Sequence, residues 1–123
     1  MSRRLTILSF SYKVGLPKEA DIVLDVRFLR NPFYEAELKA LTGLDQKAAD
    51  YIAADPGFTD YYEKMVEWLE VFLTDYLPKR DADMVIAIGC TGGQHRSVYV
   101  AQKLGDFLQQ QGYPVSVSHR DIP

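Results

Sequence analysis

Short apolar runs alternate with longer amphipathic segments along the chain, which is the pattern of strands and helices in turn. Four runs, rich in β-branched residues and bounded by turn residues, have the length of strands: residues 5–10, 22–24, 83–88 and 115–118. In the last run valines alternate with serines, which is typical of a strand at the edge of a sheet. The sequence therefore predicts four strands spread over its whole length.

Two longer segments have the three and four residue spacing of an amphipathic helix. The clearer one begins at Phe58 and keeps aromatic and apolar residues on one side up to Tyr76, and Pro78 stops it. The other starts near Gln94 and ends at Gly112, with Val98, Ala101, Leu104 and Leu108 on one side. We expect both helices to pack on the sheet through these apolar stripes.

Shorter helical patterns lie between the second strand and the first long helix. We expect one short helix over residues 35–41 and a second that is capped by Asp45 and runs through Ile52. Strands that alternate with helices predict an α/β fold, with a mostly parallel sheet of about four strands and helices on both faces. The length of 123 residues, 47% of them hydrophobic, fits a single domain over residues 1–123.

Charge and cysteine content narrow the classes of function. The chain has 14 basic and 17 acidic side chains and a net charge of −3, so its overall field does not favour non-specific binding to nucleic acid. One cysteine and two histidines give no disulfide and no metal-ligand spacing, so we expect neither metal nor cofactor. The first apolar run is too short for a signal peptide and no window approaches a membrane span, so we expect a cytoplasmic protein without a membrane partner.

Polar residues follow each predicted strand at its carboxyl end. In a parallel sheet these ends share one edge, and α/β proteins bind ligands there. The residues placed at that edge are Ser11, Lys13, Asp25, Arg27, residues 90–97, His119 and Arg120. We expect a ligand site among them, and an ion pair between Asp25 and Arg27 is compatible with it because both project to the same side of an extended chain.

A glycine-rich turn between the third strand and the last helix is the strongest local signal. Gly92 and Gly93 accept positive φ, the backbone N–H groups of such a turn converge, and a helix N-terminus attracts anions. Arg96 adds a planar fork that suits phosphate oxygens, and His95 beside it is expected to face the same ligand. The alternative is a merely structural turn, with Cys90 as a small buried apolar residue.

An enzyme remains an alternative for the same turn. Cys90 and Arg96 stand in a C-x5-R frame followed by Ser97, which resembles the phosphate-binding loop of cysteine-dependent phosphatases. In such a loop Cys90 would be the thiolate nucleophile and Arg96 would hold the charge of the transition state. Because the frame places no general acid, our first hypothesis assigns no catalytic residue.

Several segments resemble one family along nearly the whole chain, in order. They are residues 10–17, 25–29, 31–32, 41–45 and 88–99, and together they resemble the C-terminal domain of the RapZ family of RNase adapter proteins, also called YvcJ. In that family an N-terminal P-loop domain binds nucleotide. The C-terminal domain is similar to a sugar-phosphate-binding subdomain of phosphofructokinase and binds RNA and glucosamine 6-phosphate.

The resemblance implies a metabolite pocket formed by Asp25, Arg27, Asn31, Thr91, Gly92, Gly93, His95 and Arg96. We add the remaining residues of the turn, Cys90, Gln94 and Ser97, as ligand-binding candidates. Phe33 stands where enterobacterial members have a histidine after the Asn-Pro pair. The chain contains no G-x-x-x-x-G-K-[ST] motif, so we expect no hydrolysis of a nucleotide by a P-loop of this chain.

These observations favour a non-catalytic sensor or adapter domain that binds a phosphorylated small molecule, an aminosugar phosphate by resemblance. A stand-alone RNA-binding module is the other class that we consider, with Lys13, Arg30 and Arg120 as contacts beside Arg27 and Arg96. The resemblance also implies a separate P-loop protein as a partner and assembly into a homo-oligomer.

Overall fold

A four-stranded parallel sheet forms the centre of the structure, a computed structural model that describes residues 4–80 and 82–122. The strands are β1 (Leu5–Ser11), β2 (Ile22–Asp25), β3 (Met84–Cys90) and β4 (Val115–His119). Their order in the sheet is β2-β3-β1-β4, and every neighbouring pair is parallel. The predicted α/β class, the four strands and the edge position of the last strand are confirmed.

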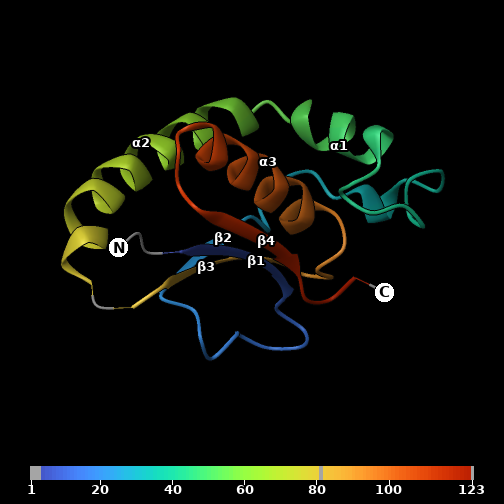
Figure 1. Cartoon of the computed structure of the whole chain (residues 1–123). Coiled ribbons are helices and arrows are strands. Elements are labelled where there is room, and N and C mark those ends of the chain that lie inside the picture. The colour runs from blue at the N-terminus through green and yellow to red at the C-terminus, as the bar shows by residue number, and fades with distance from the viewer. Residues whose placement is uncertain (1–3, 81, 123) are drawn as a thin grey trace.

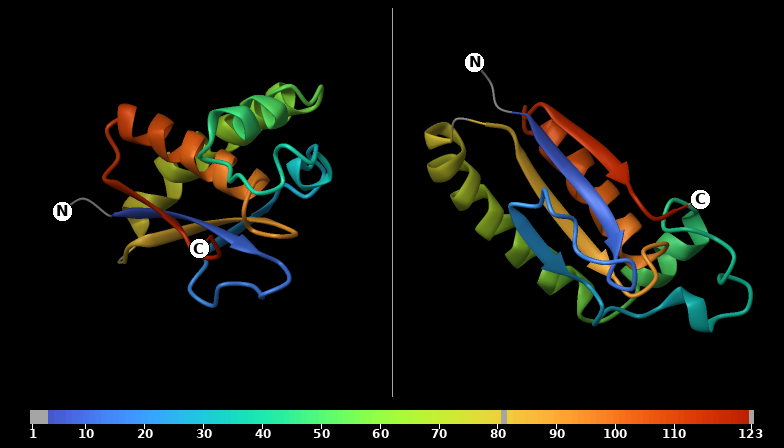
Figure 2. Two further views of the ribbon diagram at one scale, coloured as in Figure 1. Left: turned by 90° about the vertical axis from the view of Figure 1, so that its right-hand side faces the viewer. Right: turned by 90° about the horizontal axis from the view of Figure 1, so that it is seen from below.

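Helices connect the strands on one side of the sheet. They are α1 (Gln46–Ala53), α2 (Phe58–Tyr76) and α3 (Arg96–Gln110), with short 3-10 helices η1 (Pro32–Tyr34) and η2 (Leu77–Lys79). Figure 1 shows α1, α2 and α3 above the sheet, with only the connection between β1 and β2 below it, and the left view of Figure 2 agrees. The helices therefore cover one face of the sheet, whereas we had expected helices on both faces.

The handedness of the connections explains this one-sided cover. The connections from β2 to β3 and from β3 to β4 cross the sheet in one direction, whereas the connection from β1 to β2 crosses it in the other. Because crossovers between parallel strands are right-handed, the reversed connection must lie on the opposite face. That connection, residues 12–21, contains Gly15 and Pro17 and forms no helix.

The apolar stripes of α2 and α3 form the core with the strand side chains that face them. In α2 the stripe is confirmed by the burial of Phe58, Met65, Leu69 and Leu73. The predicted stripe of α3 is buried as well, and this helix contacts β1, β3 and β4. On the other face of the sheet, the Phe10 and Tyr12 rings pack edge to face with centroids 4.9 Å apart.

The short helical patterns behave differently from the long ones. We expected a helix over residues 35–41, but residues 35–40 form turns that follow the 3-10 helix η1. A segment of seven residues is too short to be a stable helix by itself. Asp45 precedes α1 as predicted, but its side chain makes no capping bond to the helix. Its carboxylate instead accepts a hydrogen bond from the Thr42 N–H at 2.7 Å.

No helix in the described part of the chain has the length and apolar character that crossing a membrane requires. The longest one, α2, carries charged side chains on its outer side, among them Glu63, Lys64, Glu67 and Glu70.

Candidate functional site

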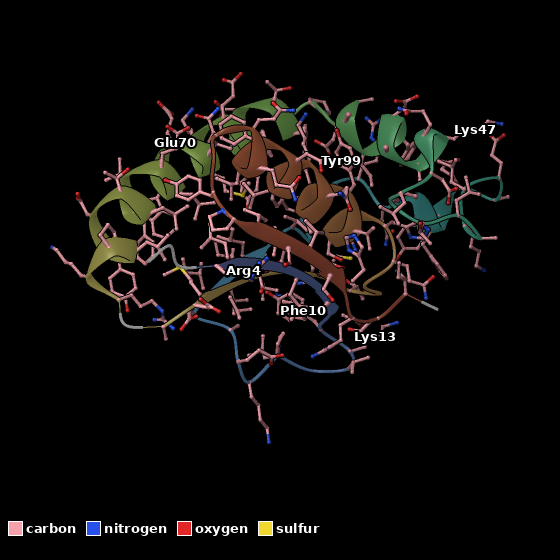
Figure 3. All side chains as sticks on the ribbon, in the orientation of Figure 1. Arg4, Phe10, Lys13, Lys47, Glu70 and Tyr99 are labelled. Carbon is pink, nitrogen blue, oxygen red and sulfur yellow. The ribbon has the colours of Figure 1, made fainter. Side chains whose placement is uncertain are left out.

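A cavity of about 800 Å³ opens at the carboxyl edge of the sheet. β1 and β3 are neighbours there, with Ser11 opposite Cys90, and their outgoing connections leave toward opposite faces. This is the arrangement in which open α/β sheets form a binding crevice. Figure 3 shows Lys13 just beyond the end of β1 at this edge. The residues that line the cavity are Ser11, Lys13, Val14, Asn31, Phe33, Tyr34, Ala36, Lys39, Ala40, Cys90, Thr91, Gly92, Gln94, His95 and Arg96.

Most of the ligand-binding candidates from the sequence meet in this cavity. The candidates in its lining are Asn31, Cys90, Thr91, Gly92, Gln94, His95 and Arg96, and the RNA candidate Lys13 joins them. The candidates outside the lining are Asp25, Arg27, Gly93, Ser97, Arg30 and Arg120. The loop after β3 and the end of β1 are thus brought together, while the end of β2 contributes to another part of the surface.

Gly93 fixes the loop after β3 against β1. Its φ is +71°, in the left-handed region, and a Cβ at this position would lie 2.8 Å from both the backbone N and the Cβ of Ser11. The Ser11 hydroxyl donates to the Thr91 carbonyl oxygen at 2.7 Å and accepts from the Lys13 N–H at 3.1 Å. Ser11 therefore joins the loop of β3 to the segment that carries Lys13.

His95 lies between this loop and the segment around Gly43. The Gly43 N–H donates to the Gln94 carbonyl at 2.8 Å, and a Cβ at Gly43 would lie 2.2 Å from the His95 carbonyl oxygen. Burial lowers the pKa of His95, an effect that neighbouring backbone carbonyls, that of Leu41 first, oppose in part. The side chain is 6% exposed, and its buried Nε2 has no hydrogen-bond partner among the described residues. Burial therefore favours the neutral imidazole at this position.

Arg96 is the buried cation of the site. Its side chain is 4% exposed, and Nη1 donates to the Leu29 carbonyl at 3.1 Å and to the Arg27 carbonyl. Its Nε is buried and has no partner, and no carboxylate forms an ion pair with Arg96 in the part of the chain that the structure describes. Asp25 interacts with Arg96 coulombically but does not pair with it directly, and since a buried charge is costly without a bonded counter-charge, the site favours an anion at Arg96.

Asp25 and Arg27 pair with each other at the end of β2. Arg27 Nη2 lies 2.7 Å from Asp25 Oδ2, and Arg27 Nε lies 3.0 Å from Oδ1. This bidentate contact holds the pKa of Asp25 below its usual value, and both side chains are exposed. The Arg27 guanidinium also lies 3.8 Å from the centre of the Tyr12 ring. The ion pair that the sequence allowed is therefore present, beside the cavity and not in its lining.

Cys90 has the surroundings of a structural residue. It is 2% exposed, it belongs to the apolar core cluster, and its Sγ donates to the Ser97 Oγ at 3.1 Å. Ser97 is itself buried in the first turn of α3. A nucleophilic cysteine requires an accessible thiolate, which these contacts do not provide. Within the described residues, no three His, Cys, Asp or Glu side chains are grouped to hold a metal ion.

The cations proposed for RNA have different environments. Arg120 forms an ion pair with Asp121 at 2.9 Å and donates to the Gly15 carbonyl at 2.7 Å. The Arg30 guanidinium lies over the Tyr51 ring of α1, 5.2 Å from its centre. Lys13 is exposed and lines the cavity, so the three charges belong to different contacts and do not share one environment.

Six residues of the cavity lining were not among the sequence candidates: Val14, Phe33, Tyr34, Ala36, Lys39 and Ala40. The Phe33 and Tyr34 rings are nearly perpendicular, at 84°, with centroids 5.8 Å apart, and Lys39 Nζ lies 4.5 Å from the centre of the Phe33 ring. The aromatic pair directly follows the candidate Asn31, which was the available signal. Lys39 gave none, because the segment around it was expected to be a covering helix.

Comparison with known proteins gives a match along the chain. The model of the family described as RapZ C-terminal domain matches residues 3–123. A protein named nucleotide-binding protein from Lactiplantibacillus plantarum is 49% identical over 96% of this chain and 40% of its own length. A protein of the same name from Desulforamulus reducens is 44% identical. The nucleotide-binding protein amb4396 from Paramagnetospirillum magneticum is 46% identical. The chain spans about two fifths of the length of these relatives.

Proposed function

Because the chain belongs to the family of RapZ C-terminal domains, we propose that it binds a phosphorylated small molecule, in the simplest case a sugar phosphate, in the cavity at the carboxyl edge of the sheet. In this proposal the domain is a sensor or adapter and not a catalyst. Binding of the ligand changes the state of a partner and leaves the ligand chemically unchanged.

The buried guanidinium of Arg96 carries the proposal. It stands at the N-terminus of α3, and its Nε has no partner among the described residues. A phosphate oxygen there would receive a charge-assisted hydrogen bond from Nε and would lie near the backbone N–H groups of the preceding loop. The phosphate would supply a directly bonded negative charge, whereas Asp25 acts on Arg96 only through the coulombic interaction that helps to lower the pKa of Asp25.

A sensor role agrees with the way the cavity is assembled. Its walls come from the end of β1, the segment around Asn31 and the loop of residues 91–95, which are far apart in sequence. A ligand that contacts all three walls stabilises their arrangement, by about 2.7 kcal/mol when its concentration is 100 times Kd. A partner that contacts these segments would then respond to the ligand. Cys90 belongs to the lining but is 2% exposed and donates to Ser97, so in this proposal it is not a nucleophile.

Thermal unfolding with a panel of sugar phosphates tests the proposal. We expect hexose 6-phosphates to raise Tm and the corresponding unphosphorylated hexoses to have no effect. Arg96→Gln removes the charge and should abolish the shift, whereas Lys47→Ala, a charge removal on the outer side of α1, should keep it. Far-UV circular dichroism of Arg96→Gln controls for folding. If no phosphate stabilises the wild type, or if Arg96→Gln keeps the full shift, the proposal is wrong.

Contact with RNA is a further part of the family's proposed role. Arg27 and Arg120 are paired with carboxylates and Arg96 is buried, so Lys13 and Arg30 would have to supply most of the charge. Neutralising few phosphates gives a shallow dependence of affinity on salt. We would measure the affinity for a structured RNA at salt concentrations from roughly 50 to 200 mM. The slope of affinity against salt tests this part of the proposal. A steep slope would contradict the assignment of the charge to Lys13 and Arg30, and no binding at the low-salt end would contradict RNA contact itself.

Larger assemblies are proposed on the same resemblance. A separate P-loop protein would supply the nucleotide binding for which the longer relatives are named. A homo-oligomer would have an apolar contact surface available on the outer side of α2, where Trp68 and Val71 are exposed. Light scattering of the purified chain, alone and with the sugar phosphate, measures the assembly state.

A further inference from the structure

We infer that Asp121 is a positioning residue of the anion site, by which we mean the part of the cavity at Arg96 and the loop of residues 91–95. Asp121 lies outside the lining of the cavity. Its carboxylate holds the backbone of Ser11, and Ser11 in turn holds the loop after β3 and the turn that carries Lys13. The inference rests on the proposed function, because it names a residue on which ligand binding in that cavity depends.

The carboxylate of Asp121 replaces a strand neighbour at the end of β1. The pairing of β1 with β4 ends at Ser9 and His119, and the Arg120 N–H still donates to the Ser9 carbonyl at 3.1 Å. Beyond that point the Ser11 N–H donates to Asp121 Oδ2 at 2.7 Å. Ser11 is 2% exposed, and a buried N–H group without an acceptor is costly. Asp121 therefore fixes the last residue of a central strand.

Ser11 passes this restraint to two walls of the cavity. Its hydroxyl donates to the Thr91 carbonyl oxygen in the loop after β3 and accepts from the Lys13 N–H. The Ser11 carbonyl accepts from the N–H groups of Val14 and Gly15, each at 3.1 Å. A shift of Ser11 would therefore displace both the loop of the anion site and the turn of residues 13–15.

Arg120 balances the charge of Asp121 and holds the same turn from another side. Its Nη2 lies 2.9 Å from Asp121 Oδ2 and donates to the Gly15 carbonyl at 2.7 Å. The side chains of Arg120 and Asp121 are 29% and 13% exposed, so water screens this pair less than it screens a pair on the open surface. With its charge balanced in this way, Asp121 is compatible with an anion site next to Ser11.

Preorganisation connects these contacts with affinity. A loop that has to be ordered when the ligand binds lowers the affinity, whereas a loop that is already held in place does not. Asp121→Ala would leave the Ser11 N–H without its acceptor and would release the loop. We expect this to weaken binding about 10-fold, which corresponds to about 1.4 kcal/mol and to the loss of one hydrogen bond to a charged group.

Isothermal titration calorimetry with inorganic phosphate, a hexose 6-phosphate and an aminohexose 6-phosphate tests the inference. Asp121→Ala should bind the tightest of these probes about 10-fold more weakly than the wild type. Asp121→Asn keeps an oxygen that can accept from the Ser11 N–H, so it should restore most of the affinity.

Asp21→Ala is the matched control. Asp21 Oδ2 accepts from the Val85 N–H at 2.9 Å, and Oδ1 lies 2.7 Å from Arg80 Nη2. The same two kinds of contact are thus made at the amino end of β3, away from the cavity. Urea unfolding should show a similar loss of stability in Asp21→Ala and Asp121→Ala, whereas only Asp121→Ala should lose affinity.

The outcomes separate the inference from the proposed function. If Asp121→Ala binds as tightly as the wild type, or if Asp121→Asn binds as weakly as Asp121→Ala, the inference is wrong while the proposed function stands. If no probe binds to the wild type, the proposed function fails. Hydrogen exchange without ligand tests the inference in either case. The amides of Ser11 and Lys13 should exchange faster in Asp121→Ala than in Asp21→Ala, and equal rates would overturn the inference.

Discussion

Replacing Gly93 by alanine should destabilise the protein, and the structure gives the size of the effect. An L residue in the left-handed region costs roughly 1–2 kcal/mol, and the φ of Gly93 is +71°. The new Cβ would also lie 2.8 Å from the backbone N and Cβ of Ser11, inside a central strand that cannot move away easily, and overpacking of this kind costs about 1–3 kcal/mol. We therefore expect Gly93→Ala to lower the free energy of unfolding by about 2–5 kcal/mol.

Gly92→Ala is the matched control for this prediction. Gly92 has no positive φ, and nothing lies within 4 Å of a Cβ placed there, so its replacement should be neutral or should stabilise by about 0.4–1 kcal/mol through the unfolded state. Urea unfolding of both variants, followed by circular dichroism, measures the difference. If Gly93→Ala is as stable as Gly92→Ala, our description of how the loop packs against β1 is wrong.

Three further predictions concern titration, core packing and thiol access. Burial lowers the pKa of His95 and of His119, so the unfolded chain binds more protons, and stability should be complete above about pH 6.5 and fall as the pH drops below it. Urea midpoints between pH 8 and 5 in the wild type and in the variant with both histidines replaced by Gln measure this, and an equally steep fall in the variant would contradict it. Leu69→Ala should cost about 2–5 kcal/mol of unfolding free energy, and Val71→Ala on the exposed side of α2 less than about 0.5, again by urea unfolding. Cys90 should react with iodoacetamide only after unfolding, because it is buried, and mass spectrometry that finds rapid native labelling would refute the structural role given to it.

The strands and the long helices follow from the sequence because their pattern and their packing agree. The stripe from Phe58 to Tyr76 is long enough to specify α2 by itself, and Pro78 lies two residues beyond it. Residues 35–40 lack such length, and tertiary contacts decide their conformation: Leu38 is the one buried side chain among them. A helical propensity over seven residues could not reveal that they form turns.

The side of the sheet on which the helices lie depends on the order of the strands, which no local pattern encodes. β1 is followed in sequence by β2 but pairs with β3 and β4. Once this order is known, the right-handed crossover rule places the connection of residues 12–21 alone on the second face. The sequence shows that this connection contains no helical pattern, but it does not show in which direction the connection crosses the sheet.

The candidate site was predictable where one segment carries it and not where distant segments meet. The loop from Thr91 to Arg96 and its position at the carboxyl edge follow from its glycines and from strand polarity. Asp25 was also expected at that edge, where it pairs with Arg27 and lies outside the lining. Lys39 enters the cavity through the turns before α1, which only the folded chain reveals.

Mapping the ligand on the backbone tests the central claim most directly. We would titrate the 15N-labelled protein with hexose 6-phosphate and follow the amide resonances in 1H–15N correlation spectra. The account predicts the largest shifts at Thr91, Gly92, Gln94 and His95, and their loss in Arg96→Gln. Shifts that gather at the opposite ends of the strands, around Leu5 or Met84, would contradict it.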